Sequence, residues 1–178
     1  MEERIVDNVS FNRISNDDLI KYLEFFFLSS SILILEKRKN IDNSLYYKCE
    51  IDSDIYELSI NIKSLSKSGW ADRLDIRRIQ VQTISNLPVT TNNSCYLLLG
   101  FCTYKDEPMC ICWNANRYVF HKSNRSCYVD VSSIYKGFQN GYYFGFDHHR
   151  EVFVSNNKNF DKLIKEYISY TYVRDIEW

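Results

Sequence analysis

The sequence has little glycine, proline or histidine, and almost no net charge. Its 178 residues include 5 glycines, 2 prolines and 3 histidines, and the formal net charge is -1. The scarcity of glycine and proline, beside 45% hydrophobic and 16% aromatic residues, excludes a disordered or low-complexity chain. The near-neutral charge excludes attraction of nucleic acid by the field of the whole molecule, so an anionic partner would need a local cationic patch.

A long apolar run is also lacking. The longest stretch, residues 25–35, is interrupted by a serine triplet and is far shorter than the ~20 residues of a membrane-spanning helix. The first four residues, Met-Glu-Glu-Arg, have neither the apolar core nor the cleavage site of a secretory signal. We therefore expect a cytoplasmic protein without a membrane partner.

The sequence lacks the spacing of a zinc site, because its cysteines form no C-x-x-C pair and no histidine completes a ligand set. Cysteines in apolar, strand-like runs behave as small buried hydrophobes, with disulfides or metal as less favoured alternatives. P-loop, dinucleotide and G-x-S-x-G motifs are absent too. We expect no cofactor, no metal and no enzymatic activity in this chain. The six cysteines are Cys49, Cys95, Cys102, Cys110, Cys112 and Cys127.

Hydrophobic periodicity predicts an α+β fold and a single domain over residues 1–178. Apolar residues at helical spacing predict an N-terminal helix at about 16–28 and a C-terminal helix at about 159–171. Between them, at about 45–155, short alternating runs predict strands joined mostly by hairpins. This order predicts a curved antiparallel sheet or pseudobarrel flanked by the two helices.

The most informative segment is residues 68–82, in which a loop with Trp70 and Arg73 leads into a strand predicted over 76–84. Alternation along this strand places one set of side chains, Arg78, Gln80 and Gln82, on one face, and a second set, Arg77, Ile79 and Val81, on the other. Arginine and glutamine suit the reading of polar base edges in the major groove. A solvated sheet face with the arginines paired to nearby aspartates is the alternative.

The order of several segments resembles the DNA-recognition domains of bacterial restriction endonucleases. The segments are RLDIRRIQ at 73–80, the hairpin from LLLGF at 97–101 to CICWN at 110–114, and EVFV at 151–154 before the last helix. Those domains adopt a DNA-binding pseudobarrel, similar to the one in plant transcription factors, whose two arms clasp the major groove. The resemblance covers roughly residues 69–168. It implies a module that recognises double-stranded DNA for a restriction or defence system, site-specific or modification-sensitive, with a nuclease or motor subunit as a further partner.

By that resemblance, residues 70–82 form one arm and the loop at 114–125 contributes to the other. Cations and small donors in this loop suit phosphate contacts, which position a protein on the duplex. An ordinary exposed connection is the alternative there. The predicted DNA-contact set is Trp70, Arg73, Arg77, Arg78, Gln80, Gln82, Arg117, Lys122, Asn124 and Arg125.

Two other functions compete with DNA recognition. A protein-interaction domain would dock a partner subunit through an edge strand or apolar face, and burial of Arg78, Gln80 and Gln82 in an internal network would favour it. A metal-dependent nuclease would use Lys63 beside carboxylates. However, Asn61 stands where such sites carry a carboxylate, and an amide is a poorer ligand for Mg²⁺.

Two remaining clusters have ordinary structural explanations. His148 and His149 beside Asp147 predict a polar hairpin tip, because neighbouring side chains on a tight turn diverge and a metal would lack ligands. The aromatic runs at 46–47 and 142–144 predict packing of the sheet. A cage for an extruded, methylated base is the alternative for these rings.

Overall fold

A computed structural model describes residues 5–10, 13–82, 87, 90–118 and 124–176. These described residues form two β-sheets and three α-helices, with short 3-10 helices between some of them. The predicted α+β class and the two terminal helices are confirmed. No described helix is both long and apolar enough to cross a membrane.

Seven strands form a large mixed sheet. Neighbouring strands are antiparallel except β3 and β6, which pair in parallel from Glu57 with Ser94 to Ser64 with Phe101. In spatial order the strands are β1 (Leu33–Lys39), β2 (Leu45–Ile51), β3 (Asp54–Ser64), β6 (Ser94–Tyr104), β7 (Glu107–Trp113), β10 (Arg150–Asn156) and β9 (Tyr142–Asp147).

Three further strands form a separate small antiparallel sheet. They are β4 (Ser66–Lys67), β5 (Ile76–Val81) and β8 (Arg125–Asp130), with β5 in the middle. The strand predicted over 76–84 is observed as β5, which ends at Val81. Residues 83 and 84 of the predicted strand lie outside the described residues. The sequence predicted the hairpins but neither the parallel pair nor the division into two sheets, and the described strands close no barrel.

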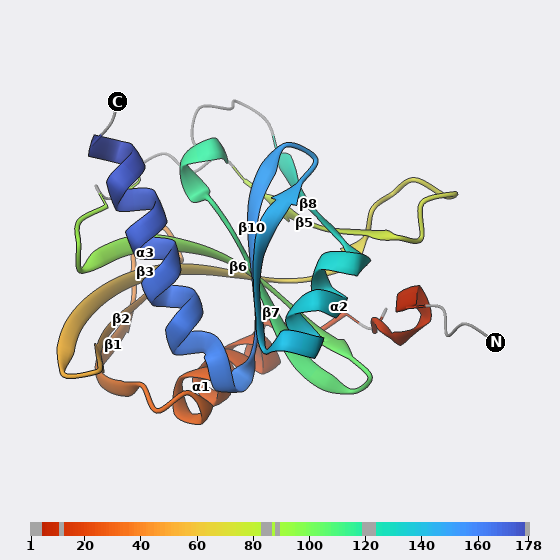
Figure 1. Cartoon of the computed structure of the whole chain (residues 1–178). Helices are drawn as coiled ribbons and strands as arrows, with labels where there is room; N and C mark the ends of the chain where they lie inside the picture. The colour runs from red at the N-terminus through yellow and green to blue at the C-terminus, as the bar shows by residue number, and fades with distance from the viewer. Residues whose placement is uncertain (1–4, 11–12, 83–86, 88–89, 119–123, 177–178) are drawn as a thin grey trace.

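The central strand β6 is buried on both faces, and its alternating side chains enter two different cores. Leu97, Leu99 and Phe101 contribute to the core under the helices, whereas Leu98 and Cys102 contribute to the core under the small sheet. The fold therefore has three layers, with the large sheet in the middle (Figure 1).

Helices α1 (Asn16–Ser29) and α3 (Phe160–Ile176) cover one face of the large sheet. Ser15 caps α1, because its Oγ accepts a hydrogen bond from the Asp18 N–H at 3.2 Å. The two helices meet through aromatic rings, since Phe160 of α3 lies 5.4 Å from Phe26 and 5.5 Å from Phe27 of α1 between ring centroids.

The opposite face of the large sheet is covered by the small sheet, the 3-10 helix η1 (Ile5–Asn8) and α2 (Val131–Asn140). Helix α2 approaches β10 closely at Gly137, where an added Cβ would lie 2.4 Å from Cγ1 of Val154. Because α2 follows β8 directly, this contact also fixes the end of the small sheet.

Candidate nucleic-acid interface

Side chains of β5 in the small sheet point alternately into the molecule and outward, as the alternation along residues 76–81 predicts. Arg77, Ile79 and Val81 of β5 are buried toward the large sheet. In the register with β8, Arg78 is opposite Tyr128 and Gln80 is opposite Ser126, and all four are half-buried or exposed. We call these four residues, together with Trp70 and His148, the small-sheet face.

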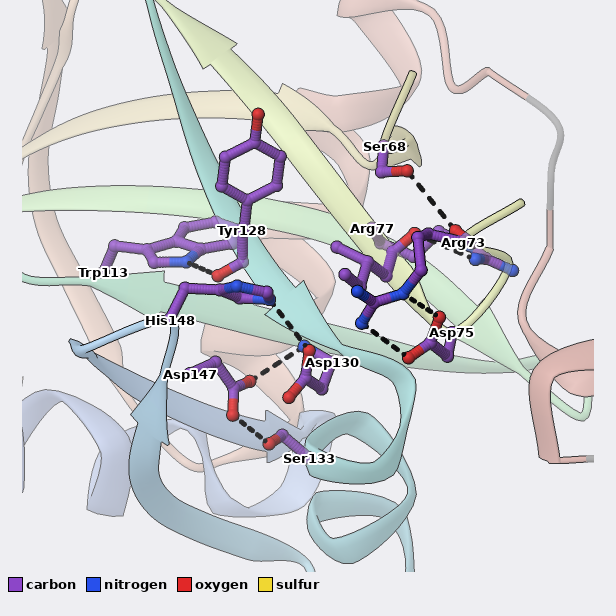
Figure 2. A network of polar contacts seen from close by, with 11 residues as sticks. Ser68, Arg73, Asp75, Arg77, Trp113, Tyr128, Asp130, Ser133, Asp147 and His148 are labelled. Atoms are coloured by element: carbon purple, nitrogen blue, oxygen red, sulfur yellow. Dashed lines mark hydrogen bonds and ion pairs between the residues drawn. The ribbon is translucent and has the colours of Figure 1, made fainter. Parts of the chain in front are cut away.

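Aromatic rings gather on this face from three parts of the chain. Trp70, from the loop before β5, lies parallel to Tyr128 of β8, with 4.9 Å between ring centroids and 14° between planes. His148, from the turn between β9 and β10, lies 5.6 Å from the same tyrosine ring. The β8 backbone beneath is fixed to the large sheet, because Nε1 of Trp113 donates a 2.8 Å hydrogen bond to the Tyr128 carbonyl (Figure 2).

A polar network holds the His148 turn against the small sheet. Nε2 of His148 lies 3.0 Å from a carboxylate oxygen of Asp130, at the end of β8. The Asp130 N–H donates to one oxygen of Asp147 at 2.8 Å, and Ser133 Oγ donates to the other at 2.9 Å (Figure 2). Burial raises the pKa of Asp147, although these two hydrogen bonds oppose the shift.

Arg77 is buried and stabilises the loop before β5 from inside the molecule. Its side chain is 1% exposed, and its guanidinium donates to the backbone carbonyls of Leu74, Ile76 and Val6. Burial lowers the pKa of Arg77. Since the side chain points into the molecule, we leave Arg77 out of the contacts proposed below.

The loop that carries Trp70 is held from several sides. Ser68 Oγ accepts from the Trp70 N–H at 3.2 Å and lies 3.3 Å from the Arg73 carbonyl, to which it donates. Arg73 itself forms a two-bond ion pair with Asp75, at 3.0 and 3.1 Å (Figure 2). Gly69 adopts a φ of +91°, and a Cβ there would lie 3.1 Å from Nη2 of Arg78. The loop therefore needs glycine beside the Arg78 guanidinium.

The rest of the predicted DNA-contact set is dispersed. Gln82 follows β5 and lines a different hollow, of about 390 Å³, together with Asn61 and Lys63. Arg117, in the 3-10 helix η2 (Ala115–Tyr118), donates two hydrogen bonds to the buried Glu151 carboxylate at 2.9 and 3.3 Å. Asn124 and Arg125 are exposed at the start of β8, whereas Lys122 lies outside the described residues.

A hollow of about 250 Å³ opens beside Trp70. Four of its lining side chains are aromatic rings, if the imidazole of His148 is counted, and two are arginines. Sequence reasoning missed Tyr128, His148 and Arg150, because their meeting depends on the pairing of β8 with β5 and on the position of the β9–β10 turn. The lining residues are Trp70, Tyr118, Arg125, Ser126, Tyr128, Asp147, His148 and Arg150.

The cysteines and the carboxylate upstream of Lys63, considered above as metal ligands, have the following surroundings in the described part of the chain. All six cysteines are buried and free of disulfides, and burial raises the pKa of each thiol. Among the described residues, no group of three or more histidine, cysteine, aspartate or glutamate side chains could hold a metal ion. Asp52, upstream of Lys63, is paired with Lys165 of α3 instead.

Comparison with known proteins gives one family. Searches of curated proteins and of solved structures find no match. A family model described as Methylase-associated X1, MTaX1, matches residues 56–164, which include every strand from β4 to β10. The description places the domain with methylases and says nothing of DNA contact. Because the matched region is more than half of the sequence, this chain belongs to the Methylase-associated X1 family.

Proposed function

We propose that this chain is a duplex-DNA-binding module of a methylase-containing restriction-modification or defence system, and that the small-sheet face contacts the DNA. The observation that carries the proposal is the gathering of Arg78, Gln80, Trp70 and Tyr128 on one outward surface. Methylases of such systems act on DNA, so the family supports a DNA-binding role for an associated domain.

The polar groups on this face suit two kinds of DNA contact. Gln80 is exposed, and its amide can pair with adenine in the major groove. Arg78 is half-buried and donates to Ser126 Oγ at 3.2 Å, which holds its guanidinium at the surface. Arg125 and Arg150 lie at the adjoining hollow, where they can reach phosphates.

Two predicted contacts receive less weight because their charges are already compensated. Arg73 is paired with Asp75, and Arg117 with Glu151. The proposed electrostatic contact set is chosen by position: Arg78 lies on the small-sheet face, and Arg125 and Arg150 line the adjoining hollow. With only three arginines and a net charge of -1, we expect modest affinity, in the range of nonspecific binding for an arbitrary sequence, about 10⁻⁴ to 10⁻⁶ M.

Fluorescence anisotropy with a labelled 20-base-pair duplex of random sequence tests the proposal across a salt series. Neutralising three phosphates should give a slope of log K against log salt of about -2.7, since each contributes roughly -0.9. The double variant Arg78→Gln, Arg125→Gln should make the slope less steep by the contribution of about two phosphate contacts. Gln80→Ala should leave the slope unchanged and alter the ranking of bound sequences when a library is selected.

Lys21→Gln supplies the matched control, because Lys21 is an exposed cation of α1 that belongs to neither the small sheet nor the hollow beside Trp70. It should bind as the unaltered protein does. Absence of duplex binding at low salt, or an equal loss of affinity in the Lys21 variant, would refute DNA binding through the small-sheet face.

A second candidate function, docking of a methylase subunit, is favoured by apolar side chains where α1 leads into β1. Leu28 is 79% exposed near the end of α1, and Leu33 and Leu35 are exposed on β1, an edge strand of the large sheet. Sedimentation of the chain with a purified methylase of the same system would test this function. Leu28→Ser with Leu33→Ser should abolish the complex and leave duplex binding intact.

A further inference from the structure

We infer that the hollow beside Trp70 receives a single nucleotide extruded from the duplex, with its base against the aromatic rings and its phosphate on Arg125 and Arg150. This inference rests on the proposed function, because the duplex must first lie on the small-sheet face. Binding of an extruded nucleotide, and a preference for a duplex with a mispair, are not required for duplex binding alone.

Trp70 is held in place although its ring is exposed. A tryptophan that is 47% exposed is normally free to move, but this ring is stacked on Tyr128 and its backbone N–H is bonded to Ser68. The Trp70 carbonyl also accepts from the Arg73 N–H at 3.1 Å. An exposed ring fixed in this way is a preorganised surface for a base, and stacking of one base on an aromatic side chain is worth about 1–3 kcal/mol.

The lining of the hollow combines aromatic rings with guanidinium groups. Rings come from the Trp70 loop, η2, β8 and the β9–β10 turn, and two guanidinium groups stand beside them. Planar rings bind a base and arginine binds phosphate bidentately, so the combination fits a nucleotide better than an apolar ligand or an isolated anion. Asp147 also lines the hollow, but both its carboxylate oxygens accept hydrogen bonds from Asp130 and Ser133.

The size and position of the hollow also suit a single base. At about 250 Å³ the hollow is smaller than most small-molecule sites, which begin near 300 Å³, so it is suited to one base and not to a stack of several. Tyr128 belongs both to the hollow and to the cross-strand pair with Arg78. A strand held at Arg78 can therefore deliver a neighbouring nucleotide to the hollow.

The test compares two duplexes of the same sequence that differ by one central mispair. Extrusion requires unpairing, which is easier at a mispair, so the protein should bind the mispaired duplex about tenfold more tightly. Trp70→Ala should bring the ratio of the two affinities close to one, because it removes the ring against which the extruded base stacks, and the ratio is compared whatever the change in affinity for the paired duplex. Trp70→Phe keeps a ring and should retain part of the preference.

Leu74→Ala is the matched control, because Leu74 is an exposed apolar residue of the same loop that does not line the hollow. It should keep the full tenfold ratio, and circular dichroism should show that all three variants are folded. Equal affinity of the unaltered protein for the two duplexes would overturn the nucleotide site and leave duplex binding standing. A mispair preference that survives Trp70→Ala would overturn it as well, whereas absence of binding to either duplex would refute both proposals.

Discussion

Removal of Arg117 should destabilise the fold because it leaves the carboxylate of Glu151 buried without its cation. Glu151 is 1% exposed and accepts from Arg117 and, at 3.2 Å, from the Tyr170 hydroxyl. Breaking a fully buried ion pair costs about 3–5 kcal/mol. Here the arginine side chain is 40% exposed, so solvent screens part of the interaction, and the Tyr170 bond remains. We expect Arg117→Ala to lower the free energy of unfolding by about 2 kcal/mol.

The double variant Arg117→Ala, Glu151→Gln separates the loss of the ion pair from the burial of a charge. Glutamine has nearly the shape of glutamate but no charge, so the double variant should recover about 1 kcal/mol relative to Arg117→Ala. Urea unfolding followed by tryptophan fluorescence measures both values, provided the dependence on urea concentration is unchanged.

The pH dependence provides a second readout with a definite sign. In the unaltered protein, burial raises the pKa of Glu151, but the hydrogen bonds from Arg117 and Tyr170 prevail and lower it overall. The pair therefore stabilises the fold at neutral pH, and this stability is lost as pH falls below about 4.5 through the lowered pKa. Without Arg117, burial dominates, so the penalty of the variant should shrink as pH falls from 7 toward 4.5.

Two results would refute this reasoning. The first is an Arg117→Ala variant as stable as the unaltered protein at pH 7, and the second is a penalty that grows as pH falls. Duplex binding by the folded variant tests whether Arg117 also contacts DNA. If Arg117 serves mainly to hold Glu151, the variant should bind the random-sequence duplex with nearly unchanged affinity, unlike Arg125→Gln.

Three further predictions concern the supports of the small sheet. Gly137→Ala should lower the free energy of unfolding by about 1 kcal/mol, because the overpacking against Val154 outweighs the gain in helix propensity. In a Val154→Ala background chemical denaturation should find a smaller cost, because Cγ1 at 2.4 Å is removed while the Cβ of residue 154, at 2.8 Å from the added Cβ, remains. Asp147→Asn can accept from the Asp130 N–H through its Oδ1 and donate from its Nδ2 to Ser133 Oγ, and it should raise the melting temperature at pH 7. Because burial raises the pKa of Asp147, this gain should vanish as pH falls through that pKa, and a gain that persists at acidic pH would contradict it. Arg77→Met should lower the free energy of unfolding by about 1–3 kcal/mol and speed amide hydrogen exchange at residues 70–75, because the hydrogen bonds to backbone carbonyls are lost. Unchanged exchange at these residues would show that Arg77 does not order the loop.

Local periodicity was enough to predict which side chains of β5 share a face. Strand alternation has a period of two, so Arg78 and Gln80 had to separate from Arg77, Ile79 and Val81 once the strand existed. The same alternation placed Arg77 with two apolar residues. Its burial was still not foreseen, because arginine is rarely fully buried and its acceptors, the carbonyls of Leu74, Ile76 and Val6, are fixed only by the tertiary fold.

Contacts between distant segments were beyond what the sequence could specify. The parallel pairing of β3 with β6 leaves no decisive local signal, because β3 alternates as an antiparallel strand does and the apolar run of β6 fits any central strand buried on both faces. The ion pair of Arg117 with Glu151 joins residues 34 positions apart. His148 was correctly predicted at a hairpin tip, but its approach to Tyr128 depends on how that hairpin lies over the small sheet.

The bond from the Trp113 indole to β8 has a consequence for how this surface can change in evolution. Its acceptor is the carbonyl of residue 128, a group that every amino acid supplies. The ring at that position can therefore be exchanged for another side chain while the anchor underneath is kept. A substitution at residue 128 would thus change the chemistry of the surface without releasing the strand that carries it.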